Sequence, residues 1–331
     1  MKAIVCTKYG APDVLELQEV RKPIPKENEV LIKVVASSVT TADTMMRKGS
    51  PYFGRLFIGL LKPKNSIPGT GFSGRVDALG KSVSLFKKGD EVFGESLFYA
   101  GTNAVYLCVA EDGIILTKPG NMSHEQAAPV CDGALTSINF LKEIANVKPG
   151  QSVLINGASG SLGTAAVQLA KYYGAKVTGV CSQNNMSLLK SLGADDVIDY
   201  TKQDFTKNEN RYDVIYDTIG KSSFSACKKA LKESGKYLSP VLSISLLFQM
   251  LRTSIMGKKK ALFAATGLKP VAELKLLLKE LKIMIEESNL ISVMDQTYSL
   301  DKIVDAHRYI ETGRKKGNVV IALEREKRNK T

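Results

Sequence analysis

Apolar and polar residues follow two different patterns along this chain, and the change comes close to residue 118. Before it, short apolar runs are broken by glycine and proline, at 3–6, 30–36, 74–78, 91–93 and 104–109. Runs of this kind are typical of short strands, so the first third of the chain predicts a β-rich domain. After Lys118-Pro119-Gly120, strand-length apolar runs alternate with longer segments of helical periodicity.

The second pattern predicts strands that alternate with helices. Ser123 and Gln126 have the spacing of a capping box, so a helix is expected to begin there. The alternation implies a parallel sheet covered by helices on both faces. Strands are expected at 152–155, 176–181, 197–200, 214–217, 236–239 and 318–323, and amphipathic helices at 271–286 and 299–312.

A glycine-rich turn directly follows the strand at 152–155 and opens a helix. Its sequence is Asn156-Gly157-Ala158-Ser159-Gly160-Ser161-Leu162-Gly163, which fits the A-x-G-x-x-G variant of the dinucleotide fingerprint. Gly160 lets the backbone approach a pyrophosphate, and Gly163 permits close packing of helix on strand. We predict that Ala158, Ser159, Gly160, Ser161, Leu162 and Gly163 bind a dinucleotide; a structural turn in an unrelated α/β fold is the alternative.

The end of the next strand bears on the choice of cofactor. NAD-binding proteins usually carry Asp or Glu there, about 20 residues after the motif, to hold the ribose 2′-hydroxyl. This chain has Cys181-Ser182-Gln183-Asn184-Asn185, without a carboxylate. Ser182 can donate a hydrogen bond to a 2′-phosphate. The sequence therefore favours NADPH over NADH, with Cys181 and Ser182 at the cofactor.

Length and charge narrow the function classes. The 331 residues predict about two domains. Lys and Arg number 46 against 33 Asp and Glu, a net charge of +13 that would suit nucleic acid, an anionic membrane or a phosphate ligand. The chain has no Trp and no basic stripe interleaved with aromatic residues, which disfavours nucleic acid. Most of the excess charge, including the tail at 325–330, is expected to be a surface property.

Cysteines and apolar segments bear on the compartment. The five cysteines contain no C-x-x-C pair, and the N-terminus lacks an apolar signal-peptide core, so a reducing cytoplasm is expected. The apolar stretch at 241–256 is interrupted by Gln249 and Arg252 and is too short to span a membrane, so it predicts a buried or interface helix. Membrane-surface association through 246–248 and 258–260 is a less favoured alternative.

Several segments together resemble the medium-chain dehydrogenase/reductase superfamily, within its zinc-free quinone oxidoreductase branch. They lie at 39–43, 67–74, 89–94, 156–163, 193–200 and 317–320. The resemblance implies an α/β fold in two domains. A GroES-like catalytic domain would comprise 1–122, completed by 297–331, and a Rossmann domain with a doubly wound parallel sheet would comprise 123–296. It further implies an active site in the interdomain cleft and a homodimer formed through the edge of the Rossmann sheet.

The same resemblance suggests roles for individual residues. Thr40 takes the place of an asparagine beside the nicotinamide, and Thr136 matches a threonine near that ring. Tyr200 matches a tyrosine near the adenosine ribose, and Asn318 replaces a lysine of the closing motif. The alternative is that Thr40 only ends a strand and has no functional role.

Two further side chains are candidates for proton transfer. Tyr52 follows Gly49-Ser50-Pro51 in a loop that the resemblance turns towards the cleft. A packing role is the favoured alternative for this tyrosine. Asp43 is a candidate acid, with the fixing of its loop by hydrogen bonds as the favoured alternative.

Zinc is a further candidate ligand, because related alcohol dehydrogenases use it as a Lewis acid. At the positions of the family's zinc ligands this chain has Thr40 and Thr70, with Cys131 near the third. One thiol and two hydroxyls are poor ligands for zinc, so we predict no metal. Cys131 is expected to be an inert small hydrophobe, and Asp132 to cap a helix.

These inferences converge on an NADPH-dependent, zinc-free oxidoreductase that transfers hydride to a quinone or an α,β-unsaturated carbonyl. Such acceptors are already electrophilic, and the cofactor carries the difficult step. Two alternatives stay open: a zinc-type alcohol dehydrogenase relative, and a non-catalytic regulatory protein that binds NADPH.

Overall fold

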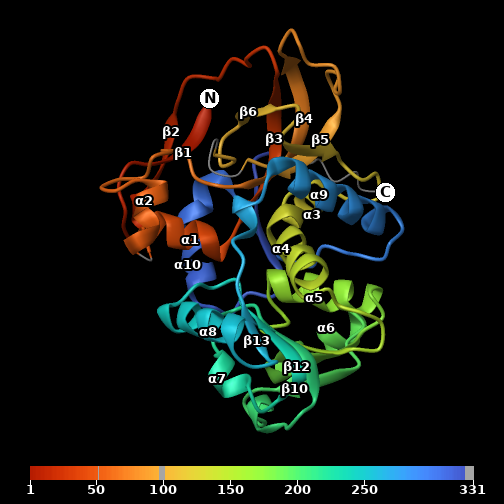
Figure 1. Cartoon of the computed structure of the whole chain (residues 1–331). Coiled ribbons are helices and arrows are strands. Elements are labelled where there is room, and N and C mark those ends of the chain that lie inside the picture. The colour runs from red at the N-terminus through yellow and green to blue at the C-terminus, as the bar shows by residue number, and fades with distance from the viewer. Residues whose placement is uncertain (51, 97–100, 325–331) are drawn as a thin grey trace. The chain divides into compact units, whose positions relative to one another are not determined.

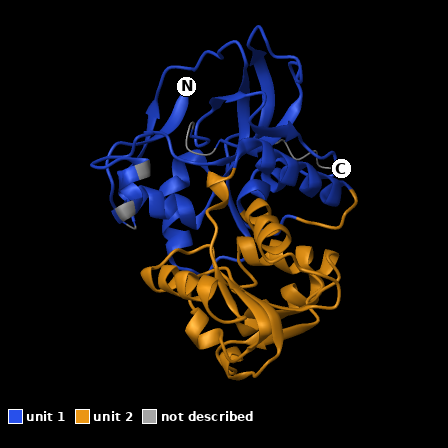
Figure 2. Cartoon of the chain, in the orientation of Figure 1, with its two compact units in different colours: residues 1–132, 270–286, 292–331 blue, residues 133–269, 287–291 orange. Residues whose placement is uncertain are grey.

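The computed structural model describes residues 1–50, 52–96 and 101–324 (Figure 1). The chain divides into two compact units (Figure 2). Unit 1 comprises Met1–Asp132, Pro270–Glu286 and Ser292–Thr331, and unit 2 comprises Gly133–Lys269 and Glu287–Ile291. The domain boundaries expected at 122 and 296 stay a prediction. The basic tail at 325–330 lies outside the described residues.

Unit 1 is built mainly on antiparallel strands. Its larger sheet has the order β14-β15-β3-β4-β5-β7, with β6 paired to β3, while β1 and β2 pair separately. Buried apolar side chains such as Ile32, Phe72 and Ile115 form the core of this sheet. The strands are β1 (Lys2–Cys6), β2 (Leu15–Glu19), β3 (Glu29–Val39), β4 (Gly71–Leu79), β5 (Glu91–Glu95), β6 (Tyr106–Ala110), β7 (Ile114–Thr117), β14 (Met294–Ser299) and β15 (Asn318–Ala322).

The helices of unit 1 confirm two predictions from local sequence. Ser123 and Gln126 form the expected capping box at the start of α3. The helix expected at 271–286 is present with those bounds as α9. The segment from 299 begins as a 3-10 turn and becomes helical only at residue 303. The helices are α1 (Thr41–Lys48), α2 (Arg55–Ile58), α3 (His124–Ala127), α9 (Val271–Glu286) and α10 (Ile303–Glu311).

Unit 2 is a parallel sheet in the order β10-β9-β8-β11-β12-β13. This corresponds to the order 3-2-1-4-5-6 of a doubly wound dinucleotide-binding sheet. The expected strands are present, whereas β13 was not predicted because its three residues are too short for a periodicity. The strands are β8 (Ser152–Asn156), β9 (Lys176–Cys181), β10 (Asp196–Asp199), β11 (Tyr212–Asp217), β12 (Leu231–Leu238) and β13 (Lys260–Leu262).

The remaining helices accompany this parallel sheet. The first of them begins in unit 1 at Val130 and continues into unit 2, where a π-helical segment over Asn139–Ile144 extends it. They are α4 (Val130–Ile138), α5 (Ser161–Tyr172), α6 (Met186–Ser191), α7 (Phe224–Cys227) and α8 (Ile244–Ile255).

Helix α8 excludes one of the two forms expected for the stretch at 241–256, a buried helix or an interface helix. The apolar stretch at 241–256 does form a helix, but only Leu246 and Thr253 of α8 are buried. Ile244 is 86% and Phe248 63% exposed, so this helix is not a buried one. Hydropathy alone could not reveal this, because it does not record which neighbours a helix meets. No helix in the described part of the chain is long and apolar enough to cross a membrane.

Candidate active site

The glycine turn lies where β8 ends and α5 begins. Gly157 has a φ of +74°, a conformation that other L residues rarely adopt. A Cβ at Gly163 would overlap the carbonyl oxygen of Gly157, so the close packing of α5 on the turn requires glycine there. A Cβ at Gly160 would meet only that same oxygen, at 3.6 Å. The protein fold therefore does not require glycine at position 160. A ligand that approaches the backbone there would require it.

The start of α5 is suited to a phosphate group. Gly160 is its N-cap residue and supplies no side chain that could accept from the first N–H groups. Such a terminus presents backbone donors and the positive end of the helix dipole to an anion. Ala158 is fully buried beneath the turn. Ser159, Ser161 and Leu162 complete the segment that the sequence assigned to the cofactor.

The segment after β9 is tied to the glycine turn by Asn185. Its Nδ2 donates to Ser159 Oγ at 3.1 Å and to Ser182 Oγ at 3.4 Å. Its Oδ1 is buried and has no hydrogen-bond partner among the described residues. Asn185 was not predicted from the sequence; its place three residues after the serine that follows β9 was the available signal.

Two other predicted cofactor residues lie at the same edge of the sheet. Burial, and then the charge of Asp199, raises the pKa of the Cys181 thiol to about 11, so it is not a thiolate at neutral pH. Tyr200 follows β10, its backbone N–H donates to the carbonyl oxygen of Cys181, and its side chain is 62% exposed. The carboxyl ends of β8, β9 and β10 thus bring the glycine turn, Ser182 and Tyr200 together.

A buried polar network fixes this edge of the sheet. The fully buried Asp217, the last residue of β11, accepts from Asn156 Nδ2 at 3.0 Å and from the Tyr237 hydroxyl at 3.0 Å. It also accepts from the backbone N–H of Ser222 at 2.8 Å. The sequence analysis missed this network, although Asn156 and Asp217 both end apolar strands.

Thr136 lies on α4, which packs closely on the start of α5. A Cβ at Gly133 would lie 2.8 Å from the carbonyl oxygen of Ser161. Ser137 Oγ donates to the carbonyl oxygen of Leu162 at 2.9 Å. Thr136 therefore belongs to a helix that is attached directly to the glycine turn.

Asn318, the remaining predicted cofactor residue, belongs to unit 1, on β15. Its Nδ2 donates to the carbonyl oxygen of Val293 at 3.0 Å and to Ser292 Oγ at 3.3 Å. Both of these partners also lie in unit 1. The amide of Asn318 is thus engaged inside its own unit.

Thr40 and Asp43 form a capping box at the start of α1. Thr40 Oγ1 and the Thr40 backbone N–H both donate to Asp43 Oδ2, at 2.7 and 2.8 Å. The Asp43 backbone N–H donates in turn to Thr40 Oγ1 at 3.1 Å. Burial raises the pKa of Asp43 above its ordinary value. The hydroxyl proton of Thr40 is thus directed at Asp43.

Tyr52 lies in a 3-10 turn of unit 1 and is 78% exposed. The guanidinium carbon of Arg55 lies 4.7 Å from the centre of its ring, a cation–π arrangement. The ring of Tyr52 therefore contacts Arg55 at the surface and is not packed in a hydrophobic core.

Asp132 belongs to a cluster of acidic groups in unit 1. Thr70 Oγ1 donates to Asp132 Oδ1 at 3.1 Å. The expectation that Asp132 only caps a helix is therefore wrong, because its carboxyl is bonded to a distant side chain. Burial, and then the charge of Asp43, raises the pKa of Asp132 to about 7. Burial, and then the charge of Asp132, raises the pKa of Glu95 well above its ordinary value. The sequence analysis missed Glu95, which lies 37 positions away in the chain.

Comparison with known proteins places the chain in a family. Residues 26–125 match the alcohol dehydrogenase GroES-like domain, and residues 192–321 match a family model described as zinc-binding dehydrogenase. A 2-methylene-furan-3-one reductase from Solanum lycopersicum is 34% identical, over 97% of this chain and 79% of that protein. A quinone oxidoreductase from Sus scrofa is 32% identical, over 94% of each. The chain belongs to the medium-chain dehydrogenase/reductase superfamily.

Solved structures agree with this assignment. The quinone oxidoreductase from Coxiella burnetii has a TM-score of 0.87 and 31% identity, covering 98% of this chain and 99% of that one. The chain therefore falls in the quinone-oxidoreductase-like branch of the superfamily, and it is an oxidoreductase. The predicted fold, a GroES-like domain with a Rossmann-type parallel sheet, is confirmed.

The side chains of this superfamily member do not fit a catalytic zinc. The hydroxyl of Thr40 is engaged with Asp43, and that of Thr70 with Asp132. Burial, and then the charge of Glu95, raises the pKa of the Cys131 thiol well above its ordinary value, which disfavours the thiolate that zinc requires. Among the described residues, no group of three or more His, Cys, Asp or Glu side chains is arranged to hold a metal ion.

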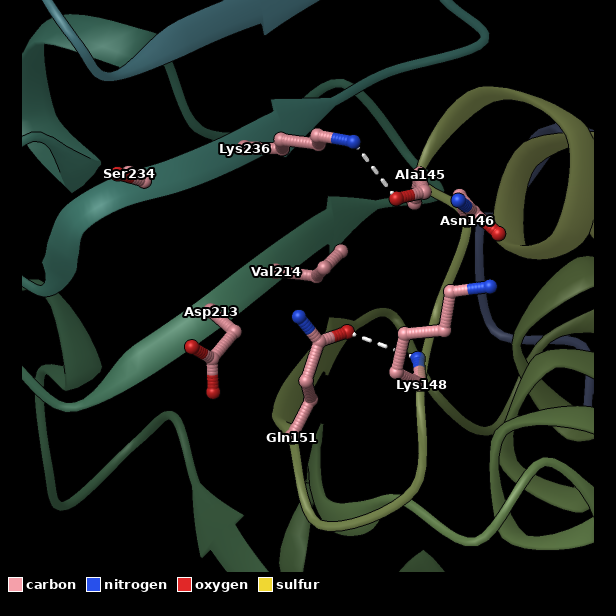
Figure 3. A pocket seen from close by; sticks show the side chains of 8 residues that line it. All are labelled: Ala145, Asn146, Lys148, Gln151, Asp213, Val214, Ser234 and Lys236. Carbon is pink, nitrogen blue, oxygen red and sulfur yellow. Dashed lines mark hydrogen bonds between the residues drawn. The ribbon is translucent and has the colours of Figure 1, made fainter.

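A small cavity in unit 2 is a different site from the glycine turn (Figure 3). Its volume is about 210 Å³, below the roughly 300–1,000 Å³ of usual cofactor pockets. Gln151 precedes β8 and Asp213 lies near the start of β11, so the cavity is at the amino ends of these strands. One of its lysines, Lys236, is engaged with the carbonyl oxygen of Ala145 at 2.7 Å.

Proposed function

We propose that this oxidoreductase transfers hydride from NADPH to a quinone or an α,β-unsaturated carbonyl, and that it does so without zinc. The observation that carries the proposal is the space beside Gly160 at the uncapped start of α5. Open space beside a glycine and a helix start without a side-chain cap together suit a pyrophosphate, and no contact within the protein requires glycine at position 160. The names of relatives support the acceptor class: an Arabidopsis thaliana protein 32% identical to this chain is an NADPH-dependent alkenal/one oxidoreductase.

The preference for NADPH rests on the segment after β9. The segment 181–185 offers hydroxyl and amide groups and no carboxylate that would repel a 2′-phosphate. Ser182 is half-buried, and Asn185 holds it beside the turn, so its hydroxyl can donate to that phosphate.

In this mechanism the bound cofactor supplies the hydride, and the chain supplies position and hydrogen bonds. The backbone donors of the Gly160 turn hold the pyrophosphate. Thr136, on the helix attached to that turn, orients the nicotinamide end, and Thr40 with Asp43 helps to shape the acceptor site. Because a quinone or enone is already electrophilic, its reduction needs hydrogen bonds to the oxygen that gains charge, and a metal is not required.

We also propose a homodimer of this enzyme, formed through the β13 edge of the parallel sheet. β13 is the last strand in the sheet order and pairs on one side with β12. Part of its other side is covered within the chain, since the Ala261 backbone N–H donates to Thr253 Oγ1 at 3.1 Å. Light scattering at several protein concentrations tests this: a dimer mass supports it, and a monomer mass at all of them contradicts it.

The central experiment measures binding and turnover together. NADPH fluorescence should show saturable binding, and NADPH oxidation should accelerate with simple quinones and enones in a substrate panel. Lack of saturable binding contradicts the proposal at its first step. Tight binding without turnover across the panel would favour a regulatory NADPH-binding protein instead.

A further inference from the structure

Two buried polar atoms converge beside Gly71, at the start of β4. A Cβ at Gly71 would lie 2.5 Å from Ser38 Oγ and 3.0 Å from Asp132 Oδ2. Both atoms are shut off from solvent, and Ser38 is close enough to act on Asp132 as a hydrogen-bond donor that lowers its pKa. Ser38 itself is 1% exposed. A buried carboxyl group is costly unless both its oxygens are well hydrogen-bonded, so such a place usually has a role or holds water.

Thr70 connects this buried place to the outside. Its hydroxyl is hydrogen-bonded to Asp132 Oδ1, the other oxygen of the same carboxyl. Thr70 and Asp132 are both half-buried, whereas Ser38 and Asp43 are almost completely buried. Asp132 Oδ2 is shut off from solvent and Oδ1 is bonded to Thr70, so within this pair Thr70 is the group that can meet a ligand from outside.

The charged groups around Asp132 come from several elements of unit 1. Asp43 on α1 and Glu95 on β5 are acidic, and Cys131 precedes Asp132 on α4. Lys315, in the segment before β15, interacts with Asp132 and Asp43 and also with Asp295 on β14. Burial lowers the pKa of Lys315 to about 8, so it offsets the negative charge of this cluster only while it is protonated.

We propose that Thr70 and Asp132 form the proton-donor pair of this enzyme, with Thr70 at the substrate oxygen and Asp132 as its source of protons. This inference rests on the proposed function. Asp132 is the group that can hold a proton near neutral pH, and Thr70 is the group that can reach outwards. In this pair Thr70 is the catalytic residue, and Asp132 acts through it.

The step balances as follows for a quinone or an enone. The acceptor gains a hydrogen and two electrons as hydride, and its oxygen becomes negative. The O–H bond of Thr70 breaks as its proton passes to that oxygen, and Asp132, protonated on Oδ1, gives this proton to Thr70 Oγ1, so the hydrogen bond between the two side chains runs from Asp132 to Thr70 in this step. Asp132 is left as a carboxylate and takes a proton from water before the next turnover.

Variants of Thr70 test the pair directly. Thr70→Val should lower kcat about 100-fold, a typical contribution of general acid catalysis, while the NADPH dissociation constant changes less than about twofold. Thr70→Ser keeps the hydroxyl and should restore kcat to within about fivefold of the wild type. Thr102→Val is the matched control, because Thr102 is a buried threonine whose hydroxyl has no partner among the described residues, and it should keep the wild-type kcat.

The pH profile separates proton donation from a structural role. In the wild type kcat should fall above a pH of about 7, where Asp132 loses its proton. The Asp132→Asn enzyme should have a low kcat that no longer falls above this pH. NADPH binding verifies that each variant is folded. A Thr70→Val enzyme as fast as the wild type, or an Asp132→Asn enzyme with an unchanged pH profile of kcat, overturns this inference and leaves the proposed function standing. Absence of turnover in the wild type overturns the proposed function and this inference together.

Discussion

Asn185 Nδ2 donates to Ser159 Oγ at 3.1 Å, across 26 positions of the chain. This hydrogen bond joins the glycine turn after β8 to the segment after β9. The same amide group also reaches Ser182 Oγ. The two loops that are proposed to hold the pyrophosphate and the 2′-phosphate are therefore held by one side chain, which is itself buried.

Asn185→Ala should weaken the binding of both cofactors, and that of NADPH more than that of NADH, because Asn185 also holds Ser182. Loss of the amide frees both loops, and the ordering they then need on binding should cost about tenfold in affinity, or about 1.4 kcal/mol. Fluorescence titration with the two cofactors measures this. The exposed neighbour Asn184 gives the control, since Asn184→Ala should bind both cofactors as the wild type does. Unchanged affinity for both cofactors would contradict a role of Asn185 in holding the two loops.

Ser182→Ala should discriminate between the cofactors. A hydrogen bond to a charged group contributes about 1.5–3 kcal/mol, so NADPH affinity should fall at least about tenfold. NADH lacks the 2′-phosphate, and its affinity should change less than about twofold. The comparison of both dissociation constants for wild type and variant is the measurement. Equal losses for the two cofactors would argue against Ser182 as a phosphate ligand.

Gly160 and Gly163 should respond differently to alanine. At Gly160 the added Cβ has room in the protein but lies where a pyrophosphate is proposed, so Gly160→Ala should lower NADPH affinity at least about tenfold without lowering the melting temperature. At Gly163 the Cβ overlaps the turn, and Gly163→Ala should destabilise the fold by about 1–3 kcal/mol. Thermal unfolding and NADPH titration of both variants test this. An unstable Gly160→Ala protein would assign that glycine a structural role instead.

His307 should make the stability of the protein depend on pH. Its side chain is 0% exposed, and neither ring nitrogen has a hydrogen-bond partner among the described residues. Burial, and then the charge of Arg47, lowers its pKa from 6.5 to about 3. The unfolded chain thus takes up a proton below a pH of about 6.5 and the folded protein does not. The free energy of unfolding should therefore fall as the pH decreases from about 6.5 towards 3, by up to about 1.4 kcal/mol per pH unit.

His307→Leu tests this contribution. Between about pH 7.5 and pH 5 the wild type should lose about 2 kcal/mol through this histidine, and the variant should lack that part of the decrease. Urea unfolding at both pH values measures it. Arg308→Gln changes an exposed residue on the same helix and should keep the wild-type pH dependence. An identical decrease in the wild type and His307→Leu would exclude His307 as its source.

Chelator treatment should leave the activity unchanged. The hydroxyl, thiol and carboxyl groups at Thr40, Thr70, Cys131 and Asp132 are a poor donor set for zinc. Turnover with quinones should therefore persist after exhaustive dialysis against a strong chelator, and elemental analysis of active protein should find zinc well below one equivalent. Stoichiometric zinc, with loss of activity on its removal, would favour the zinc-type alcohol dehydrogenase alternative.

The sequence by itself determined the parts of this protein that depend on neighbours in the chain. The capping box at Ser123, the helix over Val271–Glu286 and the strand that leads into the glycine turn all follow from local spacing and periodicity. The glycine turn can also be predicted from the sequence, because glycine is needed where φ is positive or where backbone approaches backbone.

Only the tertiary structure decided which distant side chains meet. Thr70 and Asp132 are 62 positions apart, and their hydrogen bond exists because the start of β4 and the start of α4 come together in the fold. The pKa of Asp132 is set by that environment, and the exposure of α8 by the absence of a cover within the described chain. A residue's type records its own preference for water, whereas its partners depend on how the strands and helices pack.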